Sequence, residues 1–199
     1  VWSAYGAGTD TVVVGDIDTG VDYTHPDLAA HMWVNPGEVA GNGFDDDHNG
    51  YVDDVYGIDT ANNDGDPADD HGHGTHTSGT FGAVCDNGTG IAGVAPNVKV
   101  LACKFISAAG SGSGADAIEC FNYVVAMKQR GVNVRVTSNS WGGERGGYFP
   151  SALKNAIDAA GNAGIVNVFA AGNAGVNIDV RPFDPASFTS PSIVSVAAS

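Results

Sequence analysis

Residues 12–20 read Val12-Val13-Val14-Gly15-Asp16-Ile17-Asp18-Thr19-Gly20, an apolar β-branched run that ends in a carboxylate-bearing turn. Such a run is typical of a buried strand, and glycine in the turn permits backbone conformations closed to other residues. We therefore predict a strand over residues 12–17 that holds Asp18 at its carboxyl end. Asp16 lies on the same face of this strand, where like-charge repulsion would raise the pKa of its neighbour.

The rest of the chain alternates strand and helix patterns. Strands are predicted over residues 98–105, 132–137, 165–171 and 193–196, and helices over residues 114–130 and 150–160. Gly131 follows the first helix and Pro150 opens the second, as is usual at helix ends. This order predicts an α/β fold with three layers, a mostly parallel central sheet with helices on both faces. Sites in that architecture form at the carboxyl ends of strands, where Asp18, Ser140 and Asn173 are expected.

Length and charge limit the class of protein. The 199 residues carry 23 Asp and Glu against 8 Lys and Arg, which gives a formal net charge of −15. That charge would repel phosphate backbones and anionic lipid, so nucleic acid and membranes are poor partners. The length suits one domain, and no internal repeat or linker divides it.

A second glycine-framed motif, His73-Gly74-Thr75-His76, follows Asp18. A glycine-flanked histidine that opens a small-residue helix can approach other backbone closely and act as a general base. A metal site on His71, His73 and His76 is the alternative, but the spacing differs from that of the zinc protease helix and no Glu lies between them. Asp18 also suggests an aspartic protease, which needs a second Asp-Thr/Ser-Gly that this chain lacks. Asp18 and His73 therefore indicate two members of a hydrolytic triad.

The third member of such a triad is not found. Neither Gly-x-Ser-x-Gly nor Gly-Thr-Ser occurs between Val1 and Ser199. We expect residues 1–199 to form a catalytic domain that is incomplete at its C-terminal end, with the nucleophilic serine on a missing segment that completes the same domain. An inactive peptide-binding module or an inert fragment is the alternative.

Two short segments have the character of a peptide-binding cleft. Ser140, Trp141 and Gly142 leave a predicted strand in extended form, so a peptide could pair with their backbone. The opposite edge would come from Gly110, Ser111 and Gly112. Dinucleotide binding is the alternative for these glycines, but their spacing is one residue short and no acid follows about 20 residues on.

Asn173 follows the predicted strand at residues 165–171. Its amide group could donate a hydrogen bond to a developing oxyanion. A turn asparagine is the commoner interpretation of such a residue.

Aspartates are concentrated in one segment: ten fall between Asp45 and Asp70, with no Lys or Arg among them. Part of it matches the ligand spacing of a calcium loop, with Gly50 at the sharp turn; the ligands would be Asp45, Asp47, Asn49, the Tyr51 carbonyl and Asp53. Tyr56 stands where such loops place a glutamate, so Asp54 or a remote group would complete the shell. Calcium is therefore the predicted cofactor, and its abundance outside cells predicts a secreted protein.

The three cysteines, Cys85, Cys103 and Cys120, lack the spacing of a zinc site or a redox dithiol. At most one disulfide can form among them. The pairing is not determined by the sequence.

Taken together, these motifs resemble those of the subtilisin-like serine proteases, nearly from end to end. The segments that carry the resemblance are 18–22, 25–28, 73–80, 93–96, 140–142 and 171–173. It implies endopeptidase activity on peptides held between residues 110–112 and 140–142. Asp18 would be the triad acid, His73 rather than His76 the general base, and Asn173 the oxyanion donor.

The resemblance has further implications. It implies a second calcium site that uses Asp27 and the loop at residues 86–90, and an N-terminal propeptide as a partner. Trp141 replaces the aliphatic residue common at its position, which implies an aromatic or large apolar preference for a substrate side chain upstream of the cleaved bond.

Overall fold

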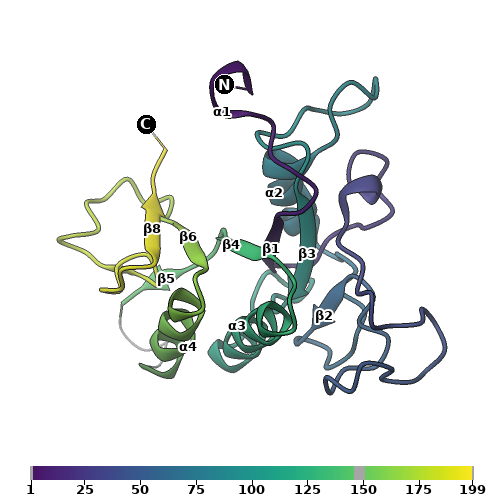
Figure 1. The fold of residues 1–199 in the computed structure, drawn as a ribbon. Helices are drawn as coiled ribbons and strands as arrows, with labels where there is room; N and C mark the ends of the chain where they lie inside the picture. Colours follow the sequence, from purple (N-terminus) through teal and green to yellow (C-terminus); the bar gives the residue numbers. More distant parts are fainter. Residues whose placement is uncertain (1, 146–150, 199) are drawn as a thin grey trace.

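A computed structural model describes residues 2–145 and 151–198, and a six-stranded parallel sheet forms its centre (Figure 1). The order of the strands across the sheet is β2-β3-β1-β4-β6-β8. Their bounds in that order are Gly57–Asp59, Lys99–Lys104, Val13–Asp18, Val134–Asn139, Val166–Ala170 and Ile193–Val196. The expected α/β class is confirmed, and the five strands predicted from the sequence lie within two residues of their expected bounds.

Helices cover both faces of the sheet: α2 (His73–Gly82) on one, α3 (Gly114–Gln129) and α4 (Ser151–Asn162) on the other (Figure 1). Successive residues of β1 show this, because side chains alternate along a strand. A Cβ on Gly15 would contact Val124 of α3 at 3.4 Å, whereas the next residue, Asp16, bonds to Ser78 of α2. The predicted opening of the second long helix by Pro150 lies outside the described residues.

Shorter elements complete the fold. They are α1 (Trp2–Tyr5), the 3-10 turn η1 (Ala29–His31), and the antiparallel pair β5 (Gly143–Glu144) and β7 (Phe183–Asp184). β2, β5 and β7 were not predicted from the sequence. Each has only two or three residues, and each is defined by a pairing partner far along the chain.

The main hydrophobic core lies between the sheet and the α3 and α4 layer. Ile17, Leu101, Phe121 and Phe169 are all fully buried there. Helix α3 begins with a capping box, in which Ser113 and Asp116 exchange side-chain to backbone bonds. The core thus fixes the strands whose carboxyl ends carry the candidate site.

A disulfide joins Cys103 of β3 to Cys120 of α3, which is the pairing that the sequence left open. Among the described residues, Cys85 is a free thiol.

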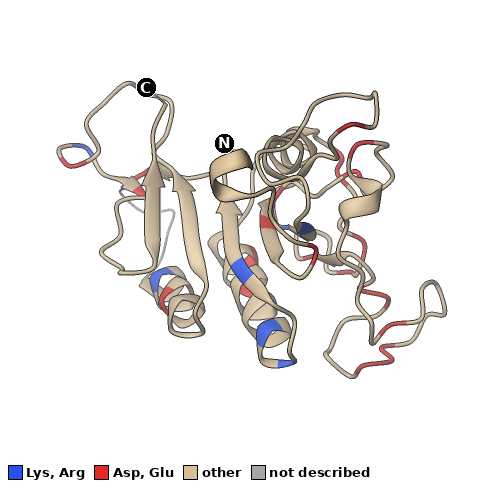
Figure 2. Ribbon diagram, turned by 45° about the horizontal axis from the view of Figure 1, so that its top comes forward, with Lys and Arg blue, Asp and Glu red and all other residues tan. Residues whose placement is uncertain are grey.

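The acidic residues gather in the loops between β1 and α2, which lie beside β2, while the few Lys and Arg are spread over β3, β4, α3, α4 and the chain near β5 and β7 (Figure 2). Within the described ranges, every helix is too short or too polar to cross a membrane.

Candidate active site

The carboxyl end of β1 and the first residue of α2 form the centre of the site. Asp18 is fully buried, and its Oδ1 lies 2.7 Å from Nδ1 of His73. The carboxylate also accepts a 2.7 Å hydrogen bond from the Thr19 backbone N–H. A carboxylate bonded to Nδ1 keeps the imidazole proton on that nitrogen and leaves Nε2 as the basic one. Since the His73 side chain is 42% exposed, this base is accessible to solvent or to a substrate.

Close backbone contact brings the two motifs together. A Cβ on Gly74, beside His73, would overlap the carbonyl oxygen of Gly20. Thr19 links the same two segments, since its hydroxyl accepts a 2.8 Å bond from Gly74 N–H and donates one of 2.8 Å to Asp69. Glycine at position 74 is therefore what allows α2 to start against the β1 turn.

The pKa values of the two buried carboxyl groups of β1 are both raised by burial. For Asp18 the hydrogen bond with His73 and its charge oppose the effect. Asp16 is 1% exposed and accepts a 3.0 Å bond from Ser78, and its pKa is raised well above the ordinary value by burial and then by the charge of Asp18. The like-charge repulsion expected from the sequence therefore raises the pKa of Asp16 rather than that of Asp18.

Two supporting residues were missed by the sequence analysis. Asp69 accepts hydrogen bonds from Thr75 and from the N–H groups of His71 and Gly72, at the start of α2. Lys104, the last residue of β3, is 1% exposed, and its ammonium donates to Asp70 at 2.6 Å, to the Thr19 carbonyl at 2.8 Å and to the Ile106 carbonyl at 2.9 Å. An Asp-Asp pair just before the histidine motif and a lysine in an apolar strand were the available signals.

The predicted peptide-binding segments meet at one hollow of about 690 Å³. Gly110, Ser111 and Gly112 line it together with Trp141 and Gly142, while Ser140 is not among its lining residues. The indole of Trp141 packs edge-on against Phe105 and donates a 2.7 Å bond to the Ile17 carbonyl. Trp141 is 9% exposed and so forms a wall rather than a mobile cover.

Asn173 is an exposed residue just beyond β6, next to Gly172, whose φ is +89°. The chains that leave β1, β4 and β6 emerge at the same edge of the sheet, because these parallel strands are neighbours. Asn173 is therefore on the same edge as Asp18. Its role as an oxyanion donor stays a prediction.

The predicted calcium loop has a different arrangement of side chains from its sequence template. Carboxylate oxygens of Asp45 and Asp47 converge with one of Glu38, all within 4.8 Å of one another. Asn49 donates to Asp47 at 3.2 Å. Asp53, by contrast, accepts hydrogen bonds from the Asn42 and Gly43 N–H groups and is not part of this cluster. Glu38, which the spacing template does not include, takes the third position.

Asp54 and Tyr51 connect this loop to α3. Asp54 is fully buried and accepts bonds from Asn35, Asn49 and Tyr123, and burial raises its pKa to about 6. The Tyr51 hydroxyl donates to Glu119 at 2.9 Å.

At the second expected cation position, the Asp27 carboxylate accepts short hydrogen bonds from the neighbouring loop. Asp27 is 3% exposed, and its carboxylate accepts bonds of 2.7 Å from the Asn87 amide and 2.8 Å from Ile91 N–H. The loop at residues 86–90 thus folds over Asp27.

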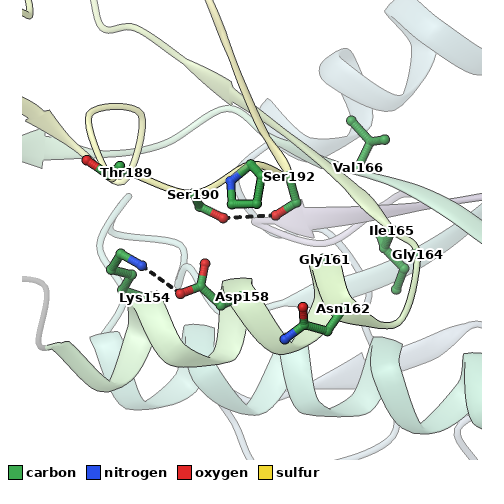
Figure 3. Close-up of a pocket in the computed structure, with 11 residues that line it drawn as sticks. Lys154, Asp158, Gly161, Asn162, Gly164, Ile165, Val166, Thr189, Ser190 and Ser192 are labelled. Carbon is green, nitrogen blue, oxygen red and sulfur yellow. Dashed lines mark hydrogen bonds and ion pairs between the residues drawn. The ribbon is translucent and has the colours of Figure 1, made fainter.

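Another hollow, of about 540 Å³, lies between α4 and residues 189–192 (Figure 3). It contains a Lys154–Asp158 ion pair within one helix and a Ser190–Ser192 hydrogen bond. None of the predicted site residues lines it. This hollow is therefore separate from the candidate site at Asp18 and His73.

Comparisons with known proteins show which family this chain is similar to. The family model Peptidase_S8, described as the subtilase family, matches residues 9–199. The "Subtilisin-like protease 1" of Plasmodium vivax is 46% identical over 118 residues, which are 59% of this chain and 19% of that protein. The "Thermophilic serine proteinase" of Bacillus sp. (strain AK1) is 34% identical over 191 residues, 96% of this chain and 39% of that protein.

A solved structure of a cold adapted subtilisin-like serine proteinase is 28% identical, with a TM-score of 0.65, and the match covers 96% of this chain and 56% of that one. The chain spans about a fifth of the length of the Plasmodium relatives.

Proposed function

Because this chain belongs to the subtilase family of subtilisin-like serine proteases, we propose that it carries the acid and base of an endopeptidase site, in which Asp18 orients His73. The observation that supports this most directly is the 2.7 Å contact between a fully buried carboxylate and Nδ1 of a half-exposed imidazole. The nucleophile would be a serine outside residues 1–199.

The proposed reaction is acyl transfer. The serine Oγ attacks the carbonyl carbon of the scissile bond, and Nε2 of His73 takes the hydroxyl proton. The Asn173 amide donates to the oxygen that gains negative charge. When the tetrahedral intermediate collapses, the C–N bond breaks and His73 returns the proton to the leaving amine; water then releases the acyl group by the same steps.

The proposed substrate is an extended segment of a protein or peptide. Its backbone would lie between residues 110–112 and residues 140–142, in keeping with the hollow that both segments line. We also propose that the protein is secreted and is made with an N-terminal propeptide.

Labelling with a fluorophosphonate tests the proposed function. We expect the intact protein to form one covalent serine adduct, located by mass analysis outside residues 1–199, and His73→Ala to abolish the labelling. Labelling that is unaffected by His73→Ala, or an adduct on a serine within residues 1–199, would contradict this assignment. Peptide binding with no adduct would favour a binding module.

Calcium is the proposed cofactor, at the cluster of Glu38, Asp45 and Asp47. The donors fit a hard cation, since all are carboxylates. One oxygen of Glu38 and one of Asp47 are buried without a hydrogen-bond partner among the described residues, although Arg130 lies 3.4 Å from the latter. Bound there, calcium would neutralise part of the acidic segment. Asp27 with the 86–90 loop is the second proposed position.

Removal of calcium is expected to lower Tm. At a concentration 100 times its Kd, a ligand adds about 2.7 kcal/mol to stability, which corresponds to a Tm change of about 5–11 °C for a domain of this size. Thermal melts with calcium and with a chelator measure it. Glu38→Gln should reduce this calcium response, whereas Asp53→Asn should keep it. The reverse result would restore the ligand set expected from the sequence.

A further inference from the structure

The two chain segments that leave β4 and β6 each carry a glycine, which has no side chain, at the place where they face each other. Gly142 lies on the wall that follows β4, and Gly172 lies on the wall that follows β6, directly before Asn173. The two strands are parallel neighbours with Asn139 opposite Phe169, so their continuations face each other. Because neither glycine has a Cβ, the space between these two backbones can hold a side chain from another segment.

The ring of Phe183 fills this gap. A Cβ added to Gly142 would overlap Cε1 of that ring, and a Cβ added to Gly172 would lie 3.1 Å from Cε2 and 3.2 Å from Cζ. One edge of the ring therefore faces Gly142 and the other faces Gly172.

Phe183 is held in this position by its backbone and by a neighbouring ion pair. It belongs to β7, which pairs with β5, and its N–H and C=O bond to Ser187 at 3.0 and 2.9 Å. Arg145 binds the next residue, Asp184, through two contacts of 2.9 and 2.8 Å. These contacts fix the backbone from which the ring extends between Gly142 and Gly172.

The position of the gap gives the ring a role in the proposed reaction. In the proposed binding mode, a peptide paired with Ser140–Gly142 that presents its scissile carbonyl to Asn173 would place the side chain of the residue bearing this carbonyl between the Gly142 and Gly172 segments, which face each other. This step rests on the proposed function. We propose that Phe183 is a specificity-determining residue, which occupies the gap and restricts the residue before the scissile bond to glycine, alanine or serine.

Phe183 and Trp141 would act on different side chains of the substrate. A large apolar substrate side chain would have to use the hollow beside Trp141, where Phe105 and Trp141 supply apolar walls. The residue adjacent to the cleaved bond would be small. The proposed cleft would then have two subsites: one beside Trp141 for a large apolar side chain, and one beside Phe183 for a small side chain.

Hydrolysis of two peptides that differ only in the residue before the scissile bond, Ala or Phe, tests the proposal with the intact protein. We expect the Ala peptide to have a kcat/KM at least about 10-fold higher, and Phe183→Ala to raise kcat/KM for the Phe peptide by about 10–200-fold while that for Ala changes less than about 3-fold. Phe188→Ala is the matched control: it removes a partly buried ring from the same segment, and the ratio should stay unchanged. Equal hydrolysis of both peptides by the unaltered protein, or an unchanged ratio in Phe183→Ala, would overturn the proposal.

A binding measurement separates this proposal from the proposed function. If the fluorophosphonate forms no adduct and no peptide is hydrolysed, calorimetric titration with peptides that end in Ala or Phe tests the gap alone. We expect the Ala-ending peptide to bind, and the Phe-ending peptide to bind comparably only after Phe183→Ala. Equal affinities for the unaltered protein would overturn the role of Phe183.

Discussion

Asp18→Asn is expected to lower kcat for peptide hydrolysis by about 10⁴-fold, a factor known from the equivalent change in another serine protease rather than from this chain. The carboxylate of Asp18 accepts the proton on Nδ1 of His73. An amide at the same position can donate to Nδ1 instead, which would leave the proton on Nε2 and remove the base. KM should change little, because Asp18 is buried beneath His73 and does not face the proposed cleft.

Steady-state kinetics with one peptide over a range of pH measure this effect. Asp16→Asn is the matched control, since Asp16 is an equally buried carboxyl of the same strand whose short hydrogen bond comes from Ser78. Its raised pKa favours the neutral form, so an amide replaces it with little change in charge. We expect kcat within about 10-fold of the unaltered protein for Asp16→Asn. An equal loss in both variants would point to general disruption of β1 rather than to the tautomer of His73.

Elements with strong local patterns were predictable from the sequence. The strand that ends at Asp18 and the helix that ends near Gly131 depend on β-branched runs and helical periodicity, which neighbouring residues supply. β2 was missed because Gly57–Asp59 become a strand only by pairing with residues 102–104, far along the chain. β5 and β7 were missed for the same reason.

The pairing of Asp18 with His73, the proposed acid and base, was predictable because each residue lies in a motif with its own backbone requirement, such as glycine at position 74. The carboxylate cluster proposed to bind calcium was only partly predictable. The spacing template assigned Asp53, but this residue has φ +55° and bonds to Asn42 and Gly43. Glu38, seven residues before Asp45, is brought in by the fold of the loop. When the conformation of a loop decides which carboxylates come together, their separation in the sequence is not fixed, and a spacing template cannot identify them.

The position of Phe183 between two glycines was not predictable from the sequence either. Phe183 lies in a segment with no motif, and its position depends on Gly142 and Gly172, which come from two other parts of the chain. The sequence shows glycines after two strands but not what occupies the space between them.

Lys104→Met is expected to lower both stability and turnover. Lys104 is buried, and its ammonium bonds to the Thr19 and Ile106 carbonyls and to Asp70. These partners belong to the turn after Asp18, to the segment that leads to Gly110, and to the loop before His73. Asp70 is 48% exposed and would return to solvent, so the main cost comes from the carbonyl acceptors left without this donor. An unsatisfied buried acceptor costs about 1–3 kcal/mol, or about 2–12 °C in Tm for a domain of this size.

The three segments hold the proposed acid, the proposed base and one wall of the proposed cleft, so their displacement should also affect the reaction. A shift of about 1 Å at a catalytic group can cost about 10²-fold in rate, and we expect a loss of that order in kcat for Lys104→Met, measured well below its Tm. Lys99→Met is the matched control, because Lys99 opens the same strand and donates to the Ala30 carbonyl at the surface. Its effect on stability should be within about 0.5 kcal/mol.

Comparing the loss in Tm with the loss in kcat shows whether Lys104 stabilises the domain or positions the proposed catalytic groups. If Lys104→Met lowers Tm but keeps kcat when it is folded, the ammonium only stabilises the domain, since the acid and base then keep their 2.7 Å contact without it. If kcat falls while KM stays nearly constant, the lysine positions the pair for proton transfer. A fall in kcat with a large rise in KM would instead place its main effect on the wall formed by Gly110–Gly112. Unchanged Tm and kcat would contradict the role inferred from its three hydrogen bonds.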